Sequence, residues 1–409
     1  MDPVKRNLTL GVVHECLWGA AQGFINPFTM LPLAAHDLGR SVADAGLLEA
    51  SLFAGMNVVQ LGAAFLFPPA WTEPRATAWM HAPALALTLA TAVSLALPLG
   101  DELHWTLLLA FVTAHWVCLG LVVPHWATLS SRNIPEAMLG RYFGWCFSAS
   151  GLATVATGVL AARLAAQGGT RWGYAACFGA AFVIQVVSAW LLGLTRPLRQ
   201  QPDPIPRLGG FLKDRWRQLF QGRLFLVFGV IVVLLQFATA STQLFTSFLK
   251  DHGARTSDFE LFNPALAAGA MLGSVTLGWL MDHRGPRAAL AAGLLPLLAG
   301  LGALSLGQGL GAGCAAFLCA GIFNMIFGSV LLPWILKLSP TGQQPAWMGL
   351  YNTLTAPWNF LAPWLLGRLA YSAGYAPAFG ISAAAVLLAF GALAALGRHG
   401  GVQAARSAA

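Results

Sequence analysis

The chain has 409 residues, of which 57% are hydrophobic and only 9% are charged, with a formal net charge of +8 at pH 7. Soluble proteins of this size carry roughly 25% charged residues, so the composition excludes a soluble globular protein. Apolar stretches of the roughly 20 residues that cross a bilayer recur along the chain. They are too long and too uniformly apolar for barrel strands. The sequence therefore predicts an all-α integral membrane protein held in a lipid bilayer.

Twelve apolar segments are predicted to be transmembrane helices. In chain order they cover 8–33, 43–67, 77–99, 104–129, 138–166, 172–195, 222–249, 259–281, 287–307, 311–336, 346–371 and 376–397. The one long polar stretch follows the sixth segment and divides the chain in two. It predicts an N-terminal six-helix bundle at 1–195, a cytoplasmic linker at 196–222, a C-terminal six-helix bundle at 223–397 and a cytoplasmic tail at 398–409.

The basic residues indicate the orientation of the chain. With the N-terminus in the cytoplasm, 17 of the 23 Lys and Arg residues fall in cytoplasmic segments; the other 6 are Arg40, Arg163, Arg171, Lys250, Arg255 and Arg368. Cytoplasmic loops are enriched in Lys and Arg. Both termini are therefore predicted to be cytoplasmic, in a cell membrane such as the bacterial inner membrane. The same enrichment explains the net positive charge without a nucleic-acid partner.

Enzyme and cofactor signatures are absent from the sequence. The six cysteines lie in apolar segments without a C-x-x-C pair, which is typical of small core residues. There is no Gly-rich phosphate loop, no H-E-x-x-H and no paired nucleophile and base. No cluster has metal-ligand spacing. We therefore expect no enzyme activity, no cofactor and no bound metal, and a monomeric chain.

The two halves repeat each other at a fixed spacing. At a shift of 209 residues the matching pairs are Pro124 with Pro333, Ser130 with Ser339, Gly140 with Gly349, Tyr142 with Tyr351, and Gly158 with Gly367. The run "GYAACFG" at Gly173 also resembles "GYAPAFG" at Gly374. Two parallel six-helix repeats, related by an axis along the membrane normal, enclose a substrate site in one large group of transporters.

The stretch "GWLMDHRGPR", after the eighth segment, resembles the G-x-x-x-D-R-x-G-R-R loop of the major facilitator superfamily. The matching residues are Gly278, Asp282, Gly285 and Arg287, whereas His283 and Pro286 depart from the pattern. The resemblance covers essentially the whole chain and implies the fold of that superfamily, with twelve helices as two parallel repeats around a central cavity. It also implies a conformational latch formed by Gly278, Asp282, Arg284, Gly285 and Arg287.

The residues themselves suggest how this loop works. Gly278 would let two helices pack closely, and Gly285 would permit a tight turn. The corresponding loop of the first half, "FPPAWTEPR", lacks the Gly and the Asp of the motif. The usual latch is therefore in doubt on that side.

Ionisable residues inside a bilayer are expensive and are functional candidates by default. Glu15, with His115 as a possible second site, is predicted to take up and release protons during transport. Glu49 is a third candidate, but its position early in the second segment predicts that it lies near enough to the periplasmic surface to be solvated. A carboxyl or imidazole that changes charge can bias two access states if it interacts differently with each.

Neutral polar and aromatic residues are the candidates for binding a substrate. They are Trp18, Gln22, Asn26, Trp116, Gln236, Thr239, Gln243, Asn324, Asn352, Thr355, Trp358 and Asn359. In the family, spans 1, 4, 7 and 10 line the cavity and spans 2, 5, 8 and 11 flank it. No Lys or Arg lies well inside the lining spans, which argues against anions such as nitrate, phosphate or dicarboxylates.

These features predict a secondary transporter that moves a small organic solute by alternating access, coupled to protons. A neutral, zwitterionic or cationic amphiphile fits the candidate residues best. The direction stays open between export of a metabolite or drug and uptake; the G-P-x-x-G-G-like run of drug/proton antiporters is missing from span 5. The alternative is a non-transporting relative that serves as a membrane receptor or assembly factor.

Overall fold

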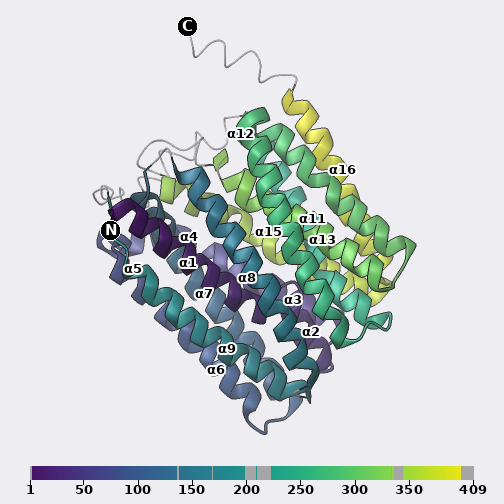
Figure 1. Cartoon of the computed structure of the whole chain (residues 1–409). Helices are drawn as coiled ribbons and strands as arrows, with labels where there is room; N and C mark the ends of the chain where they lie inside the picture. Colours follow the sequence, from purple (N-terminus) through teal and green to yellow (C-terminus); the bar gives the residue numbers. More distant parts are fainter. Residues whose placement is uncertain are drawn as a thin grey trace.

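The computed structural model describes residues 2–135, 138–167, 169–198, 209, 223–332, 334–335 and 344–397. Within these residues every regular element is a helix, and the order of the helices confirms the predicted all-α fold. Figure 1 shows the purple-to-teal helices of the first half on one side and the green-to-yellow helices of the second half on the other. The boundary predicted at 196–222 stays a prediction, because 199–208 and 210–222 lie outside the described residues.

The first half forms six crossings of the bundle, three of them from helices that are interrupted. The elements are α1 (Pro3–Phe24), α2 (Met30–Asp37), α3 (Val42–Val58), α4 (Gln60–Leu66), η1 (Pro69–Thr72), α5 (Pro74–Met80), α6 (Ala82–Ala96), α7 (Asp101–Asn133), α8 (Leu139–Gln167) and α9 (Gly169–Leu192). The interruption between α1 and α2 follows from the sequence, because Pro27 disfavours helix at Asn26. The Asn26 Oδ1 atom accepts a hydrogen bond from the amide of Phe28 at 2.9 Å and caps the break.

The second half supplies the other six crossings. Its elements are α11 (Arg223–Asp251), η3 (Thr256–Asp258), α12 (Phe259–Leu306), α13 (Leu310–Ile326), η4 (Phe327–Leu331), α15 (Gln344–Ala373) and α16 (Tyr375–Gly397). Helix α12 spans the eighth and ninth predicted segments. In the described residues, 10 helical segments are long and apolar enough to cross a membrane. The two crossings outside that set, α1 with α2 and α15, hold many of the polar residues proposed to bind substrate.

The two ends of the bundle can be told apart by their contacts. Asn7, near the start of α1, donates to the carbonyl oxygen of Asn133 at the end of α7, and Arg6 donates to that of Leu194 just after α9. We call this the terminal end, because it holds the start of α1 and, after twelve crossings, the end of α16. The opposite end, where α2 and α11 finish, is the far end. By the positive-inside rule the terminal end is predicted to be cytoplasmic.

The predicted repeat is reflected in two equivalent helix–helix contacts between the halves, α8 with α12 and α15 with α3. A Cβ at Gly158 of α8 would lie 3.0 Å from the Asn263 side chain of α12, so α8 and α12 approach closely. At the repeat-related position, a Cβ at Gly367 of α15 would lie 3.1 Å from the Cα of Gly46 in α3. Small residues let membrane helices approach to backbone contact. Gly158 and Gly367 therefore both allow close contact with a helix of the opposite half, in agreement with the 209-residue shift.

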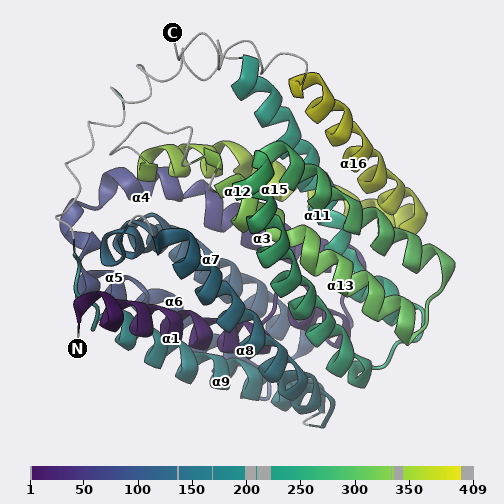
Figure 2. The same ribbon diagram turned by 45° about the horizontal axis from the view of Figure 1, so that its top comes forward.

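The halves meet along α15 as well as at these crossings. Figure 2 shows α15 beside α4 and α3, and the contacts agree: Asn352 of α15 donates to Gln60 Oε1 of α4 at 2.7 Å. The amide of Leu61 donates to Thr353 Oγ1 at 3.2 Å. Because α15 follows α3 and α4 from the far end to the terminal end, residues on this face lie between the halves.

At Gly285, α12 turns from the eighth crossing of the bundle into the ninth. Gly285 has φ of 80° and ψ of 174°, whereas the residues around it are helical. This region of backbone space is accessible essentially to glycine alone. The tight turn predicted at Gly285 is therefore present, and it reverses the chain within α12.

We expect Gly285→Ala to lower the free energy of unfolding by roughly 1–3 kcal/mol, because alanine would be strained in that conformation. The matched control is Gly278→Ala, seven positions earlier in the same helix, where a Cβ would meet no atom within 4 Å. There, alanine should be neutral or stabilise the helix by about 0.5–1 kcal/mol. Thermal unfolding of both purified variants checks this; equal melting temperatures would contradict the assigned role of Gly285.

Candidate translocation site

Glu15 lies inside the first half. Its side chain is buried, with 7% of the residue exposed, and the Trp126 indole of α7 is a hydrogen-bond partner. One carboxylate oxygen lies 3.6 Å from the Nε2 atom of His14. Tyr142 and Cys146 of α8 are close enough to interact with it electrostatically. These four contacts, the ones described for Glu15, all lie within the first half.

His115 also faces the interior of the first half. Its Nδ1 atom lies 2.9 Å from the carbonyl oxygen of Ala84 in α6, so that nitrogen donates and Nε2 carries the lone pair. The Nε2 atom is buried and has no partner among the described residues. A cavity of about 10 Å³ lies beside it, lined in part by Thr91 and Trp116. This is room for about one water molecule, and it is far too small for an organic substrate.

The aromatic candidates of the first half pack within it. The Trp18 ring lies 5.5 Å from that of His81, and Trp116 packs 5.6 Å from Phe53 of α3. Gln22 and Asn26 are half-buried, and the Asn26 side chain is used in the cap of the α1–α2 break. The structure therefore gives Trp18 and Asn26 packing and capping roles, which are compatible with but do not require contact with a substrate.

Glu49 has the most unusual surroundings of the three ionisable candidates. Only 1% of the residue is exposed, and neither carboxylate oxygen has a hydrogen-bond partner in the described part of the chain. The expectation that Glu49 is solvated at the outer surface is therefore wrong. It lies one turn from Gly46 along α3 and shares a face with Gln60, and both of these contact α15. Glu49 thus occupies the side of α3 that meets the other half.

Candidates in the second half include further amides without partners. Gln243 in α11 is 3% exposed, and its Oε1 atom is unpartnered among the described residues, as is Asn324 Oδ1 in α13. Gln236 is half-buried, and Thr239 donates to the carbonyl oxygen of Leu235 in its own helix. Gln243 lies about two helical turns from the far end of α11, and Glu49 lies about two turns from the far end of α3. Helices α3 and α11 are in contact, so these two polar groups are at similar depth between the halves.

Of the candidates on α15, Asn352 has a described contact with the first half. Asn352 bonds to Gln60, and Thr355 donates back to the carbonyl oxygen of Asn352 at 2.9 Å. Asn359 is buried at 5% exposure, whereas Trp358, at 37%, is the one most accessible. Asn352 on α15 therefore helps to join the two halves through its hydrogen bond to Gln60. The spacing of the residues alone did not predict this role.

The loop at 278–287 is described in part. Arg284 is exposed and Arg287 is half-buried; the side chain of Asp282 lies outside the described residues. The close helix packing predicted at Gly278 is not seen, since a Cβ there would meet no atom within 4 Å. His283 stacks on Trp279 with ring centroids 4.6 Å apart. The latch role of Asp282 therefore stays a prediction.

The first half has an ion pair where its copy of the loop motif is eroded. The guanidinium of Arg132, at the end of α7, donates to Glu73 Oε1 at 2.9 Å and to Thr72 Oγ1 at 2.8 Å. Arg132 is 6% exposed. The acidic group missing from the motif position is thus supplied by Glu73, nearer the start of the next helix. The signal in the sequence was that Glu73 is the single acidic residue of "FPPAWTEPR".

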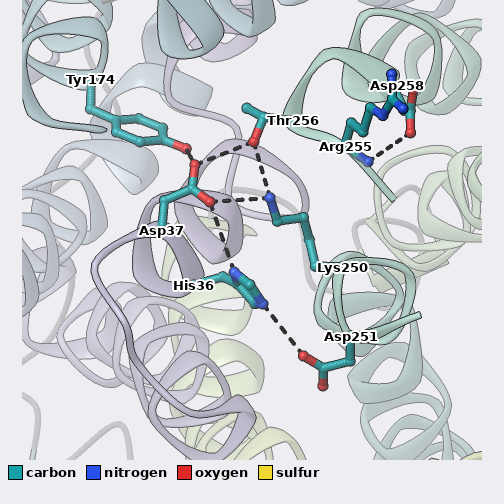
Figure 3. Close-up of polar contacts among 8 residues, drawn as sticks. All are labelled: His36, Asp37, Tyr174, Lys250, Asp251, Arg255, Thr256 and Asp258. Atoms are coloured by element: carbon teal, nitrogen blue, oxygen red, sulfur yellow. Dashed lines mark hydrogen bonds and ion pairs between the residues drawn. The ribbon is translucent and has the colours of Figure 1, made fainter. Parts of the chain in front are cut away.

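A cluster of charged residues at the far end was not predicted at all. Asp37, the last residue of α2, lies 3.1 Å from Lys250 Nζ at the end of α11. Tyr174 of α9 donates to the same carboxylate at 2.8 Å. His36 lies 3.4 Å from Asp251. Figure 3 shows these side chains converging from helices of both halves. The sequence did not point to them, because His36, Asp37, Lys250 and Asp251 fall between predicted segments, where charge is ordinary, and Tyr174 falls inside one.

These features define the class of protein: a multi-pass helical membrane transporter with two related six-helix halves and polar groups buried between them. The chain matches the sequence profile of the Major Facilitator Superfamily over residues 16–363. It belongs to the Major Facilitator Superfamily, as the loop motif and the repeat indicated, and it is accordingly a secondary transporter and not an enzyme. No curated protein sequence matches the chain.

Solved structures share the fold at low sequence identity. The nucleoside transporter NupG is 12% identical with a TM-score of 0.67, covering 97% of this chain and 100% of that one. The E. coli fucose:proton symporter FucP is 16% identical with a TM-score of 0.63, covering 94% and 97%. A bacterial homologue of the human lysosomal transporter Spinster, inward-facing and unoccupied, is 15% identical with a TM-score of 0.68, covering 96% of each chain. These similarities establish the fold alone.

Proposed function

We propose that this transporter moves a small neutral or cationic organic solute in exchange for, or together with, protons, and that Glu49 is the principal proton-coupling residue. The observation that carries the proposal is the buried carboxyl group of Glu49, which has no hydrogen-bond partner among the described residues and lies one turn from Gly46 on the side of α3 that contacts α15. An isolated ionised carboxylate in a low-dielectric interior is very costly, whereas the neutral form costs far less. The closed interface therefore accommodates Glu49 in its protonated form.

Movement of the halves would change these surroundings. When α15 separates from α3, water can reach Glu49 and solvate the carboxylate, so its proton can leave. A charge that interacts differently with two states biases the equilibrium between them. Glu15, our candidate from the sequence, does not meet this condition as well, because its neighbours all lie in one half. We therefore propose Glu15 as a secondary site and His115 as a polar group of the first half.

The proposed substrate class follows from the polar groups that are candidates for binding it. Gln243, Asn324 and Asn359 offer hydrogen bonds without positive charge, and Glu49 offers a negative charge when ionised. An anion would find no cationic partner among these residues, whereas a neutral solute or an ammonium group would. The structural similarity to the fucose:proton symporter FucP supports coupling to protons.

The test begins with binding and ends with flux. A metabolite set of neutral, cationic and anionic compounds is screened by thermal shift on the purified protein, since a ligand of the folded state raises the melting temperature. Each ligand is then assayed for uptake into proteoliposomes with and without an imposed pH gradient. We expect a neutral or cationic ligand to accumulate only with the gradient. Ligands that bind without flux would favour the receptor alternative, and gradient-independent flux would mean a uniporter.

A further inference from the structure

The far end of the bundle carries a set of polar contacts that join the two halves, here called the far-end lock: His36, Asp37, Lys250, Asp251 and Thr256. Asp37 belongs to the first half, and its carboxylate lies 3.1 Å from Lys250 Nζ and 3.5 Å from Thr256 Oγ1 of the second half. Lys250 also donates to Thr256 at 3.0 Å. The side chains of Asp37 and Lys250 are 17% and 11% exposed, so this pair is largely shielded from water and weakly screened.

A second bridge crosses the same gap through an imidazole. The His36 Nδ1 atom lies 3.8 Å from Asp37, and its Nε2 atom lies 3.4 Å from Asp251 on the opposite half. His36 thus stands between two carboxylates, one from each half, as Figure 3 shows. Only a protonated imidazole can attract both at once, and histidine is the side chain that changes charge between pH 5 and 8. The side chain of His36 is 34% exposed, so protons from solution can reach it.

We propose that the far-end lock holds this end of the transporter closed, with Asp37–Lys250 as its constant bridge and His36 as a proton-dependent bridge that strengthens closure at acidic pH. The lock lies beyond the predicted span 8–33 and about two helical turns above Glu49, so it is separate from the proposed coupling site. It rests on the proposed function for its purpose, but its existence can be measured without a substrate.

The contacts described for the other ionisable groups near His36 lie within one half and do not join the halves. Tyr174 donates to Asp37, and Tyr375 donates to Asp251. The His252 ring is bonded at Nδ1 to the carbonyl oxygen of Phe248 in its own helix, so it does not join the halves. Asp44 of α3 is engaged by Ser41, and Asp258 of η3 by the amide of Arg255.

Asp37 keeps its charge over the relevant range. Burial by itself would raise the pKa of Asp37, but the contacts from His36 and Tyr174 and the charge of Lys250 outweigh it and lower the pKa below its ordinary value. The stabilisation from such a group is present above its ordinary pKa and is lost only as the pH falls through the lowered value. Between about pH 5 and 8 the Asp37–Lys250 bridge is therefore constant, and variants of His36 and His252 decide which imidazole causes a change of closure in that range.

The test is hydrogen–deuterium exchange of the full-length protein in lipid nanodiscs without substrate, followed in peptides that cover 36–41 and 250–256. Lys250→Met keeps most of the side chain and removes the charge, which leaves Asp37 without its cation. We expect exchange in both peptides to rise at least about tenfold. The control is Glu102→Gln, which removes the partner of Arg40 at the same end but within one half. The charge-swapped double variant Asp37→Lys with Lys250→Asp should restore slow exchange.

The pH arm compares His36→Asn with His252→Asn. In the wild type and in His252→Asn, exchange corrected for its intrinsic pH dependence should be slower at about pH 5.5 than at about pH 7.5, by roughly fivefold. His36→Asn should lose this difference. The proposal is overturned if Lys250→Met exchanges no faster than the Glu102→Gln control, if the charge swap fails to restore protection, or if His36→Asn keeps the pH response. None of these outcomes depends on whether Glu49 couples protons to transport.

Discussion

Glu49→Gln is expected to lower proton-driven accumulation of substrate strongly, while the protein stays folded and still exchanges substrate across the membrane. Glutamine fixes the neutral form that the closed interface accommodates, so the two access states no longer differ in the charge they hold. Coupling free energies of this kind typically change an equilibrium about 5- to 150-fold, and accumulation in proteoliposomes under an imposed pH gradient should fall by a factor in that range. Exchange of labelled for unlabelled substrate, without a gradient, should stay near wild type.

The matched comparison is Glu15→Gln, a buried carboxyl at similar exposure whose neighbours lie in one half. We expect this variant to lower the melting temperature, since it disturbs contacts with His14 and Trp126, but to retain most of the gradient-driven accumulation. The reverse pattern, with accumulation lost in Glu15→Gln and kept in Glu49→Gln, would return the coupling role to Glu15 and refute our assignment.

Gly46→Val is expected to prevent closure of the far end. A Cβ at this position would lie 2.8 Å from the backbone oxygen of Pro363 and 3.1 Å from Gly367 in the opposite half. Neither backbone can give way without moving α15 as a whole. Overpacking at such a site costs roughly 1–3 kcal/mol, which would shift the equilibrium about 5- to 150-fold toward states in which α3 and α15 are apart. Net transport should fall accordingly.

Gly62→Val is the control in the same span, because a Cβ there meets its nearest neighbour, a Leu66 methyl, at an ordinary 3.8 Å. Hydrogen exchange at the far end and substrate flux are measured for both variants. Faster far-end exchange with an unchanged melting temperature in Gly46→Val would show that the halves, and not the fold, are affected. Wild-type exchange and flux in Gly46→Val would mean that the crossing is looser than its geometry indicates.

Much of the fold was predictable because bilayer physics leaves few options for an apolar chain. The predicted segments 259–281 and 287–307 meet at Gly285, where the helix reverses, and Gly158 and Gly367 occupy the equivalent crossings that the repeat implied. Segment length and small-residue spacing are local properties of the sequence. They could therefore be seen without knowing which helices are neighbours.

The candidate site was less predictable, because it depends on which helix each side chain faces. Glu15 and Glu49 look alike in sequence, but the neighbours of Glu15 lie in one half, whereas Glu49 lies on the side of α3 that meets α15. The pairing of Asp37 with Lys250 joins residues more than 200 positions apart, and no periodicity reveals such a contact. His115 was proposed as a second proton site and stays a prediction; its imidazole lies 2.9 Å from the carbonyl oxygen of Ala84 inside the first half, a contact that the sequence does not reveal. In each example the rotation of the helix about its axis decides which neighbouring helix the side chain faces, and this rotation depends on the packing of the whole bundle.

The unequal connections within the two halves have a mechanical consequence. In the second half a single residue with non-helical dihedrals, Gly285, separates the eighth crossing from the ninth. In the first half, residues 67–73 separate α4 from α5, with a short turn of helix at η1. A connection of one residue cannot lengthen, so a tilt of the eighth helix must also tilt the ninth. The longer connection in the first half can bend, so α4 can tilt without moving α5. The second half should therefore move more nearly as a rigid body, and the internal deformation during transport should be larger in the first half.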